Sequence, residues 1–444
     1  MNTVNSLPNE VEKALTMLRK AGFEAYIIGG CVRDRLMGVE PKDYDITTSA
    51  QPTQTEQVFK SFRVIETGIK HGTVTVLING LPLEITTYRI DSKYSDNRRP
   101  DNVTFTKNLV EDTKRRDFTM NAVAMDEKGN YVDNHGGISD INDHIIRCVG
   151  DPDKRFGEDA LRILRAIRFS SVLGFEIEQS TKDAVFRCKD LLRNISMERI
   201  SSELVKILCG KDACRVIIEY VDVLGTVIPE IYEMKDFDQH TPYHIYDVLE
   251  HTAHVVENVS VDPVMRLAAL FHDIAKPKTL TIDQGVGHFY GHAKLGGEMT
   301  NSIMKRLKFD NETRETAVEI VSLHCNQITN SETAIKRFMS KHSCDILFKV
   351  IELKKADERA KHPSCLQRID ELEKIEQTAR DIIEKNECFS LKSLTINGKD
   401  LIAIGYKPGK ELGECLSHLL DSVISGDLAN ERDALIFAAQ QFKK

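Results

Sequence analysis

The stretch Tyr26–Ala50, YIIGGCVRDRLMGVEPKDYDITTSA, decides how the first part of this chain folds. Its apolar start predicts a buried strand, which runs into two glycines and a charged turn. A second predicted strand then carries Asp43 and Asp45, one residue apart. Side chains two positions apart on a strand point to the same face. We therefore expect the two carboxylates to face together, although like charges repel.

A divalent cation would remove this repulsion. Glu84 lies on the next predicted hairpin, where it can join Asp43 and Asp45. Three clustered carboxylates are costly unless a cation lies between them. Mg²⁺, which binds carboxylate and phosphate oxygens, suits such a group. The competing interpretation is an Asx turn at Asp43, with Asp45 exposed to water.

The two glycines favour a phosphate-binding interpretation. Backbone without a Cβ at Gly29 and Gly30 lets N–H groups approach a phosphate, and Arg33 lies at the start of the next predicted helix, where anions are favoured. Taken alone, the glycines are typical of a simple turn. Together with Asp43 and Asp45 they predict metal-assisted phosphoryl transfer. Two cations on the aspartates would orient a nucleoside triphosphate and activate an attacking hydroxyl.

Composition excludes several classes of protein. A chain of 444 residues with 41% hydrophobic and 29% charged residues is ordinary for a globular protein, and its length suggests roughly three domains. No apolar run approaches the ~18 residues that span a membrane, and the N-terminus has no signal-peptide core. Ten cysteines without a CxxC pair suit reduced thiols in a cytoplasm. The net charge of −8 gives no global sign of nucleic-acid binding.

The fold class follows from where strand-like and helical hydrophobic periodicities occur along the chain. HGTVTVLINGLPLEITTYR alternates apolar and polar residues on both sides of Asn79-Gly80, which predicts a hairpin with a two-residue turn. From about Phe156 onward helical periodicity dominates. The chain is therefore expected to be α+β, with a mixed head followed by an all-helical remainder. Composition suggests domain breaks near residues 151, 240 and 386.

Several motifs resemble those of one family. They are GGCVRD, DYDITTSA, RRDFTMNAVAMD, EDALRILRAIRF, ISMERISSELVKIL and GYKPGKELGECLSHLLDSV, and together they extend over nearly the whole chain. In this order they resemble the bacterial tRNA nucleotidyltransferases of class II, the CCA-adding enzymes and their poly(A) polymerase relatives. The resemblance implies a polymerase-β-type nucleotidyltransferase head over 1–150 and a helical neck and body over 151–239. A metal-dependent domain over 240–385 and a helical tail over 386–444 would follow.

The same resemblance assigns roles to residues of this sequence. It implies that Asp43 and Asp45 bind Mg²⁺ and that Glu84 is the third carboxylate of the catalytic group. It also implies nucleotide contacts for Gly30, Arg33, Arg116, Asp159, Arg162, Arg165 and Arg168.

One pair of these residues has a chemical preference among bases. Asp159, Arg162, Arg165 and Arg168 recur at intervals of three on a predicted helix, so only the first two can face one base edge. A carboxylate only accepts hydrogen bonds and a guanidinium only donates them. Cytosine and adenine present an amine beside a ring-nitrogen acceptor, whereas uracil and guanine present the opposite pattern. We therefore expect this pair to accept CTP and ATP. Ion pairs along an exposed helix are the alternative.

Two nearby segments have open interpretations. Residues 118–124 alternate as a core-facing strand does, with Arg116 placed for the triphosphate and Asn121 for a ribose hydroxyl, while Asp117 is either structural or positioning. The loop 93–101 contains Tyr94, Arg98 and Arg99 and suits stacking and phosphate contacts with a single-stranded RNA end. It is equally typical of a solvated loop. Among relatives, such a loop favours addition of CCA or of the terminal A.

Histidines in the region 240–385 resemble a second type of site. His251, the adjacent His272-Asp273 and Asp357 match the pattern of the HD domain, a fold of metal-dependent phosphohydrolases, and His292 and His324 lie where two-metal members carry extra ligands. Imidazole with carboxylate suits Mn, Fe, Co, Ni or Zn better than Mg²⁺. His244, His254 and His288 are interpreted as satisfied core residues.

The sequence thus predicts a template-independent nucleotidyltransferase that adds or repairs the 3′-terminal CCA of tRNA. Its expected partners are tRNA, CTP and ATP, with no membrane, and its expected location is the cytoplasm. Alternatives within the class are addition of only the terminal A, or poly(A) synthesis. An alternative of another class is an HD phosphodiesterase whose head only binds RNA.

Overall fold

The structure is a computed structural model that describes residues 6–69, 72–91 and 102–442. The chain forms two compact units, Met1–Pro229 and Glu230–Lys444. The observed division lies about ten residues before the expected break near 240. The finer division into four domains stays a prediction, as does the role of the loop 93–101, because that loop lies outside the described residues.

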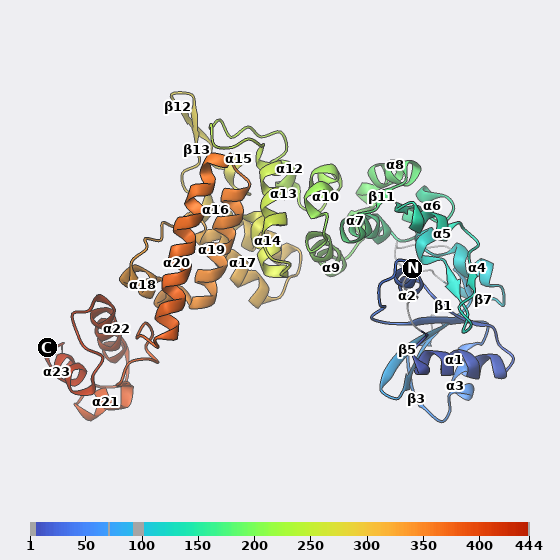
Figure 1. Cartoon of the computed structure of the whole chain (residues 1–444), viewed down its shortest axis with the longest axis horizontal. Coiled ribbons are helices and arrows are strands. Elements are labelled where there is room, and N and C mark those ends of the chain that lie inside the picture. Colours follow the sequence, from blue (N-terminus) through green and yellow to red (C-terminus); the bar gives the residue numbers. More distant parts are fainter. Residues whose placement is uncertain (1–5, 70–71, 92–101, 443–444) are drawn as a thin grey trace. The chain divides into compact units, whose positions relative to one another are not determined.

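A seven-stranded sheet forms the first part of the first unit (Figure 1). Its order is β3-β4-β5-β2-β1-β8-β9. The strands are β1 (Ala25–Ile28), β2 (Asp45–Thr48), β3 (Arg63–Gly68), β4 (Thr73–Ile78), β5 (Leu81–Thr87), β8 (Ala124–Met125) and β9 (Tyr131–Val132). The central strand β2 runs parallel to β5 and antiparallel to β1.

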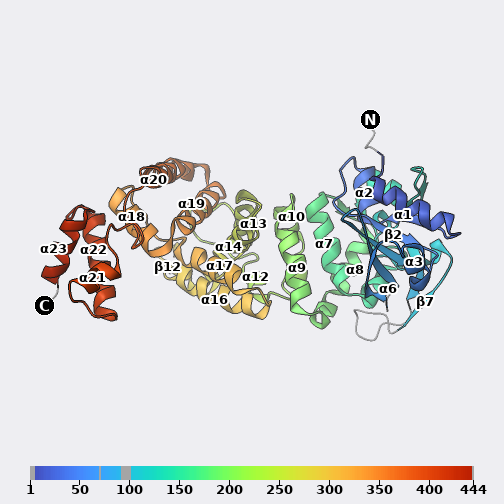
Figure 2. The ribbon, with the colours of Figure 1, turned by 90° about the horizontal axis from the view of Figure 1, so that it is seen from below.

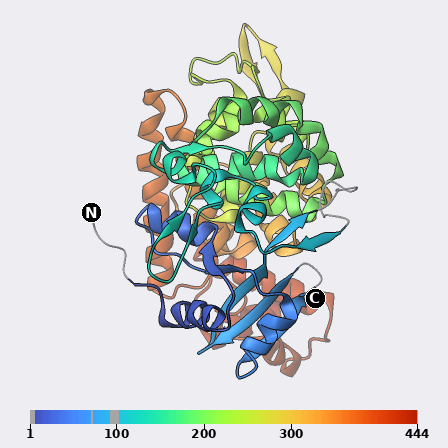
Figure 3. The ribbon, with the colours of Figure 1, turned by 90° about the vertical axis from the view of Figure 1, so that its right-hand side faces the viewer.

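The two faces of this sheet have different surroundings. Ile46 and Ile85 belong to a buried core that also includes apolar residues of α1 (Asn9–Lys20), and α3 (Pro52–Val58) contacts β4 and β5 (Figure 3). Because side chains alternate along a strand, Asp45 and Glu84, the register neighbours one position earlier, point to the opposite face. The sheet therefore has an apolar face under helices and a carboxylate-bearing face.

The predicted hairpin is confirmed. Strands β4 and β5 pair antiparallel from Thr73↔Thr86 to Ile78↔Leu81, leaving a two-residue turn at Asn79-Gly80. Both turn residues have positive φ, 50° and 87°. This conformation, which Asn and Gly adopt readily, matches the twist of the two strands.

Helices make up most of the rest of the first unit (Figure 2). They are α2 (Gly30–Leu36), α4 (Leu109–Lys114), α5 (Gly137–Asn142), α6 (Pro152–Glu158), α7 (Leu161–Leu173), α8 (Gln179–Arg187), α9 (Met197–Leu208), α10 (Ala213–Glu219), α11 (Val221–Leu224) and α12 (Pro229–Tyr232), which reaches into the second unit. The short strands β6 (Arg89–Asp91) with β7 (Val103–Phe105) and β10 (Ile145–Ile146) with β11 (Glu176–Ile177) form two small sheets. Helix α7 packs along α9, and this contact brings residues about forty positions apart together.

The expected strand over residues 118–124 is wrong. Thr119–Asn121 form a single 3-10 turn, and only Ala124 and Met125 belong to a strand. Every residue from Phe118 to Ala124 is buried, including Thr119 and Asn121. The alternation in the sequence therefore did not reflect two faces of a strand. Backbone hydrogen bonds from the N–H of Asn121 to Phe118 and from that of Ala122 to Thr119 close a turn in place of a strand ladder.

The second unit is helical apart from the hairpin of β12 (Thr281–Asp283) and β13 (Val286–His288). Its helices are α13 (Val248–Asn258), α14 (Pro263–Phe271), α15 (Lys276–Thr279), α16 (His292–Arg306), α17 (Asn311–Leu323), α18 (Glu332–His342), α19 (Cys344–Arg359), α20 (Gln367–Glu384), α21 (Gly398–Ala403), α22 (Lys410–Ser425) and α23 (Arg432–Phe442). Helices α13, α14, α17 and α19 contact one another. The last three helices share a separate buried cluster.

Two expectations about the chemistry of the chain can be compared with the structure. All ten cysteines are free thiols, as expected. Among the described residues, no helix is both long and apolar enough to cross a membrane.

Candidate nucleotide and metal sites

A cavity of about 520 Å³ opens on the carboxylate-bearing face of the sheet. It brings together most of the residues that the sequence assigned to catalysis and nucleotide binding. Its lining includes Gly29, Gly30, Arg33, Asp43, Asp45, Arg116, Asp117, Asn121, Arg165, Arg168, Phe169 and Lys206.

The carboxylates of this cavity lie at the start of β2. Asp45 is the first residue of the strand, so Asp43 precedes the strand and is not part of it, contrary to expectation. Both still line the cavity. Burial, Glu84 and Asp43 together raise the pKa of Asp45 to about 6, while Arg116 opposes the shift. The expected repulsion among three carboxylates is therefore present, and a cation would relieve it.

Gly29 permits a close approach of the backbone to this carboxylate. Its φ is +90°, a conformation that other residues rarely adopt. A Cβ at this position would lie 3.6 Å from Nη1 of Arg116 and 3.7 Å from Oδ2 of Asp45. Both are ordinary contact distances, so it is the positive φ, just before α2 begins at Gly30, that requires glycine here.

A chain of polar contacts connects four of the lining residues. Nη1 of Arg33 donates to Oδ1 of Asn121 at 2.9 Å, and Nδ2 of Asn121 donates to Oδ1 of Asp117 at 3.3 Å. Nη2 of Arg165 donates to Oδ2 of Asp117 at 2.5 Å. Although burial favours the neutral acid, Arg165 holds the pKa of Asp117 well below its ordinary value. Asp117 thus fixes Arg165 and Asn121 in place, which supports the positioning interpretation.

Phe169 is a functional neighbour that the sequence did not reveal. Its ring lies 5.1 Å from the guanidinium of Arg33, 5.5 Å from that of Arg165 and 4.2 Å from that of Arg168. Nε of Arg168 also lies 3.2 Å from Oε2 of Glu203. Stacking on an aromatic face holds a guanidinium without neutralising it. Each of the three guanidiniums is also paired with a carboxylate, that of Asp34, Asp117 or Glu203, so this wall of the cavity holds three positioned cations whose charge is largely balanced.

Asp159 and Arg162 are not among the residues that line the cavity. The continuous helix expected to carry both is interrupted between them. Helix α6 ends at Glu158, Asp159 has an extended backbone with φ −135°, and α7 begins at Leu161. Oδ1 of Asp159 accepts a hydrogen bond from the backbone N–H of Leu161 at 3.2 Å. Short acidic side chains favour such helix caps over helix interiors, which explains the interruption.

The side chains of Asp159 and Arg162 are already bonded to other groups of the protein. Nη2 of Arg199, from α9, donates to Oδ2 of Asp159 at 3.0 Å. Arg162 is buried, and it donates to Oε2 of Glu158 at 2.9 Å and to the backbone oxygen of Arg115 at 2.7 Å. The two side chains therefore do not present a shared edge to a base in this structure. Arg165 and Arg168, for which the resemblance implies nucleotide contacts, do line the cavity.

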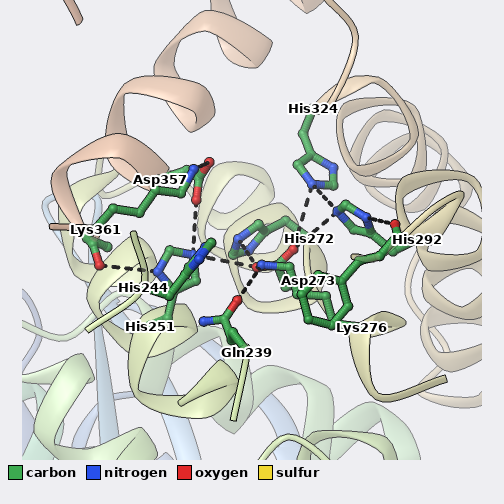
Figure 4. Close-up of polar contacts among 12 residues, drawn as sticks. Gln239, His244, His251, His272, Asp273, Lys276, His292, His324, Asp357 and Lys361 are labelled. Atoms are coloured by element: carbon green, nitrogen blue, oxygen red, sulfur yellow. Dashed lines mark hydrogen bonds and ion pairs between the residues drawn. The ribbon is translucent and has the colours of Figure 1, made fainter. Parts of the chain in front are cut away.

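A second cluster lies in the helical unit (Figure 4). It joins His251 on α13, His272-Asp273 after α14, and Asp357 on α19. Nε2 of His251 lies 3.0 Å from Oδ1 of Asp357 and 3.5 Å from Oδ2 of Asp273. Nε2 of His272 lies 3.1 Å from Oδ2 of Asp273. Residues that are about a hundred positions apart thus meet at one point, as the sequence pattern predicted.

Four histidines of the cluster have the same orientation. In each, Nδ1 faces a backbone carbonyl oxygen. The distances are 3.3 Å for His251 to Ala360, 2.7 Å for His272 to Ala269, 2.7 Å for His292 to Phe289 and 2.6 Å for His324 to Val321. A carbonyl accepts only, so Nδ1 carries a proton in each ring and Nε2 is the atom turned toward the cluster. Histidines that bind metals usually have this arrangement.

The inner atoms of the cluster are buried and face opposite charges. Nε2 of His251, Nε2 of His272 and Oδ2 of Asp273 form no hydrogen bond with the described residues, but they lie in ion-pair contact with Asp357, Asp273 and Lys276. Burial lowers the pKa of His251, and it lowers that of His324 to about 3, so both rings stay neutral. Neutral imidazoles and carboxylates are the ligands that a transition metal requires. The residues present therefore fit a metal ion.

Lysines that the sequence interpretation did not include complete this site. Nζ of Lys276 lies 2.6 Å from Oδ2 of Asp273, and Nζ of Lys361 donates to Oδ2 of Asp357 at 2.6 Å. Both line a cavity of about 510 Å³ with Tyr243. His244 lines the same cavity, and its buried Nε2 has no hydrogen-bond partner among the described residues, so its interpretation as a satisfied core residue is wrong. The position of Lys276, three residues after Asp273, was the available signal.

Family models match three parts of the chain. A model described as the poly A polymerase head domain matches residues 25–147. A model described as the probable RNA and SrmB-binding site of polymerase A matches residues 174–231. A model described as a putative tRNA nucleotidyltransferase domain 2 matches residues 284–439.

Similar proteins cover the whole length. A CCA-adding enzyme of Ligilactobacillus salivarius is 34% identical over 99% of this chain and 98% of the relative, and one of Lactobacillus helveticus is 36% identical over 98% of each. The crystal structure of the Bacillus stearothermophilus CCA-adding enzyme in complex with CTP covers 97% of this chain and 96% of that one, with 27% identity and a TM-score of 0.73. The Thermotoga maritima CCA-adding enzyme complexed with tRNA_CCA is 19% identical, covers 99% of this chain and 98% of its own, and shares the fold with a TM-score of 0.60.

Proposed function

The chain belongs to the family of CCA-adding enzymes, and on this premise we propose that it builds or repairs the 3′-terminal CCA of tRNA from CTP and ATP. The 3′-hydroxyl of the RNA attacks the α-phosphate of the nucleotide, and pyrophosphate leaves. One observation supports this reaction most strongly. A single cavity contains the carboxylates Asp43 and Asp45 beside Arg33, Arg116 and Arg168.

Each group of lining residues has a role in this proposal. Asp43 and Asp45 hold divalent cations, with Mg²⁺ the ion that suits oxygen ligands and phosphate, and Glu84 adds negative charge beside Asp45. The ions, when bound, neutralise the phosphates and activate the attacking hydroxyl. Arg33 and Arg116 bind the triphosphate, together with Gly30, Arg165 and Arg168. Asn121, held by Asp117, is within the cavity and available to a ribose hydroxyl.

Base selection by Asp159 and Arg162 belongs to the same proposal. Their chemistry suits cytosine and adenine, because one group only accepts and the other only donates. In this structure Asp159 is paired with Arg199, and Arg162 with Glu158. Selection therefore requires both side chains to leave these partners when a nucleotide binds. Addition of only the terminal A and poly(A) synthesis use the same groups and remain the alternatives within the class.

The experiment is extension of a tRNA that lacks its 3′ end, with each labelled nucleotide supplied in turn. The wild-type protein should add C, C and A and should not use UTP or GTP. Asp43→Ala and Asp45→Ala should abolish addition while the far-UV circular dichroism stays unchanged. Asp190→Ala removes an exposed carboxylate of the same unit and should extend normally. Extension by Asp45→Ala near the wild-type rate would contradict the cation assignment.

A second candidate function belongs to the helical unit. We propose that His251, His272, Asp273 and Asp357 hold a transition metal, as in HD-domain phosphohydrolases, beside Lys276 and Lys361, which are paired with Asp273 and Asp357. The observation that favours it is the shared orientation of the imidazoles, with Nδ1 on carbonyls and Nε2 directed at Asp273 and Asp357. The rival of another class is an HD phosphodiesterase whose head only binds RNA. The intact cavity around Asp45 disfavours it.

This second proposal has its own assay. Purified protein is given 2′,3′-cyclic phosphate or phosphomonoester ends with Mn²⁺, Co²⁺ or Ni²⁺, and release of the product is measured. Wild type should hydrolyse at least one substrate, and His272→Ala should lose that activity. If wild type hydrolyses neither substrate with any of these ions, the cluster has a structural or RNA-binding role instead.

A further inference from the structure

A buried carboxylate lies next to the cavity that contains Asp45. Asp112, on α4, has no exposed surface, and it is not among the residues that line the cavity. Its Oδ1 accepts hydrogen bonds from Nε and Nη2 of Arg115, at 2.9 Å and 2.8 Å, and from the backbone N–H of Arg89 at 3.2 Å. A carboxylate taken out of water needs such donors, and these hold it in one orientation.

The other oxygen of Asp112 faces the strand that carries Asp45. Oγ1 of Thr47 donates to Oδ2 of Asp112 at 3.2 Å. Thr47 lies two residues after Asp45 on β2, so both side chains point to the same face of the sheet. Asp112 is therefore fixed against the strand on which the expected cation ligand lies.

The same oxygen also faces Arg116, which lines the cavity. Nη2 of Arg116 lies 3.8 Å from Oδ2 of Asp112, too far for a hydrogen bond but close enough for electrostatic attraction. Nε of Arg116 is buried and has no hydrogen-bond partner among the described residues. Arg116 is thus attracted to Asp112 while its Nη2 can still donate to a phosphate.

This arrangement differs from that of the other arginines in the cavity. Each of them lies within 3.2 Å of a carboxylate oxygen, in the pairs Arg33–Asp34, Arg165–Asp117 and Arg168–Glu203. Asp112 instead gives its short hydrogen bonds to Arg115, so it attracts Arg116 without occupying it. A cation bound at Asp45 would repel Arg116, whereas the buried Asp112 would continue to attract it.

We propose that Asp112 is the positioning residue of Arg116 and keeps this guanidinium in the cavity, available to the triphosphate of the incoming nucleotide. The inference rests on the proposed nucleotide addition and assigns to that reaction a residue outside the cavity. Asp112 acts on the nucleotide only through Arg116. Its contribution to nucleotide binding should therefore disappear when the side chain of Arg116 is removed.

The test is a double-mutant cycle on CTP binding by the full-length protein. Asp112→Asn keeps the size of the side chain and removes its charge. It should weaken the binding of labelled CTP with Mg²⁺, measured by equilibrium dialysis, about fivefold or more. The KM for CTP in tRNA extension should rise in proportion, while the KM for tRNA stays unchanged. In an Arg116→Ala background, Asp112→Asn should have no further effect on CTP binding.

A second buried carboxylate provides the matched control. Asp140 accepts a hydrogen bond from Oγ1 of Thr119 at 2.6 Å and pairs with Arg147, and none of these three residues lines the cavity. Asp140→Asn therefore removes a similar buried charge and should leave CTP binding unchanged. If Asp112→Asn does not fold, Thr47→Val removes one of the donors that fix Asp112 and should weaken CTP binding by a smaller factor.

The outcomes separate this inference from the proposed function. Equal weakening of CTP binding with and without Arg116 would show a general structural effect and overturn the inference. Normal CTP binding by folded Asp112→Asn, or by Thr47→Val where that variant replaces it, would also overturn it while nucleotide addition by wild type stands. A wild-type protein that neither binds CTP nor extends tRNA would contradict the proposed function and the inference with it.

Discussion

At the scale of single residues, Asp45 combines a functional position with an unfavourable environment. Burial, Glu84 and Asp43 raise its pKa from 3.8 to about 6. A carboxyl that is more basic in the folded state than in the unfolded state favours folding while it is protonated. That contribution is lost as the pH rises from about 4 to about 6. Without a cation, the neutral-pH protein therefore contains an ionised Asp45 that opposes folding.

Asp45→Asn should consequently stabilise the metal-free protein at neutral pH. In EDTA its melting temperature should exceed that of wild type at pH 7.5 and match it at pH 4, because the charge is absent from both proteins in acid. Thermal denaturation followed by circular dichroism at the two pH values measures this. Asp190→Asn, an exposed site, is the control. An equal difference at both pH values would assign the effect to packing rather than to charge.

Base selection can be tested separately from triphosphate binding with variants in α7 and just before it. Asp159→Ala and Arg162→Ala should relax the choice among CTP, ATP, UTP and GTP, because they remove the acceptor and the donor. Arg168→Ala should weaken all four nucleotides alike, since Arg168 lies in the cavity against Phe169. Incorporation of each nucleotide by the three variants is the measurement. Unchanged ratios in the first two would remove them from base selection.

At the scale of elements, sequence patterns were sufficient to predict those features that short-range interactions determine. The turn at Asn79-Gly80 follows from short-range preferences and is present in the structure. The interruption at Asp159 was not predictable from periodicity, because a spacing of three continues through a helix cap as well as through a helix. The cluster pattern around His272 was predictable from the spacing of its histidines and aspartates.

The contact between α9 and α7 leads to a prediction that periodicity could not provide. Arg199 on α9 holds Asp159 away from the cavity, so Arg199→Ala should lower the KM for CTP and ATP. A half-buried ion pair contributes about 1 kcal/mol, which corresponds to roughly fivefold. Steady-state kinetics measure the change, and Arg193→Ala, whose partner Asp190 is exposed, is the matched control. A higher KM with weaker discrimination would mean that Arg199 positions Asp159 on the base.

At the scale of the whole molecule, the two sites lie in separately packed units with different ligand chemistry. Asp45 is a carboxylate on a sheet, whereas His272 belongs to an imidazole cluster among helices. Units with their own cores usually keep separate chemistry. Sequence reasoning anticipated this separation because the two motif sets use different residue types at different periodicities.

The corresponding prediction tests each of two variants in both assays. Asp45→Ala should eliminate nucleotide addition and leave metal-dependent hydrolysis untouched, while His272→Ala should do the reverse. Both activities are measured on each protein with the same preparation. Loss of hydrolysis in Asp45→Ala together with its retention in His272→Ala would place the second activity in the other unit.

The carbonyls that orient the histidines have a consequence for motion. Those facing His272 and His324 belong to Ala269 and Val321, in the last turns of α14 and α17, where a helix leaves its final oxygens without backbone partners. The imidazoles thus close the helix ends as well as facing the cluster. A metal ion bound to the imidazoles would therefore also hold the two helix ends closed. A chelator should accelerate amide hydrogen exchange in the last turns of α14 and α17 before it does so elsewhere in the unit.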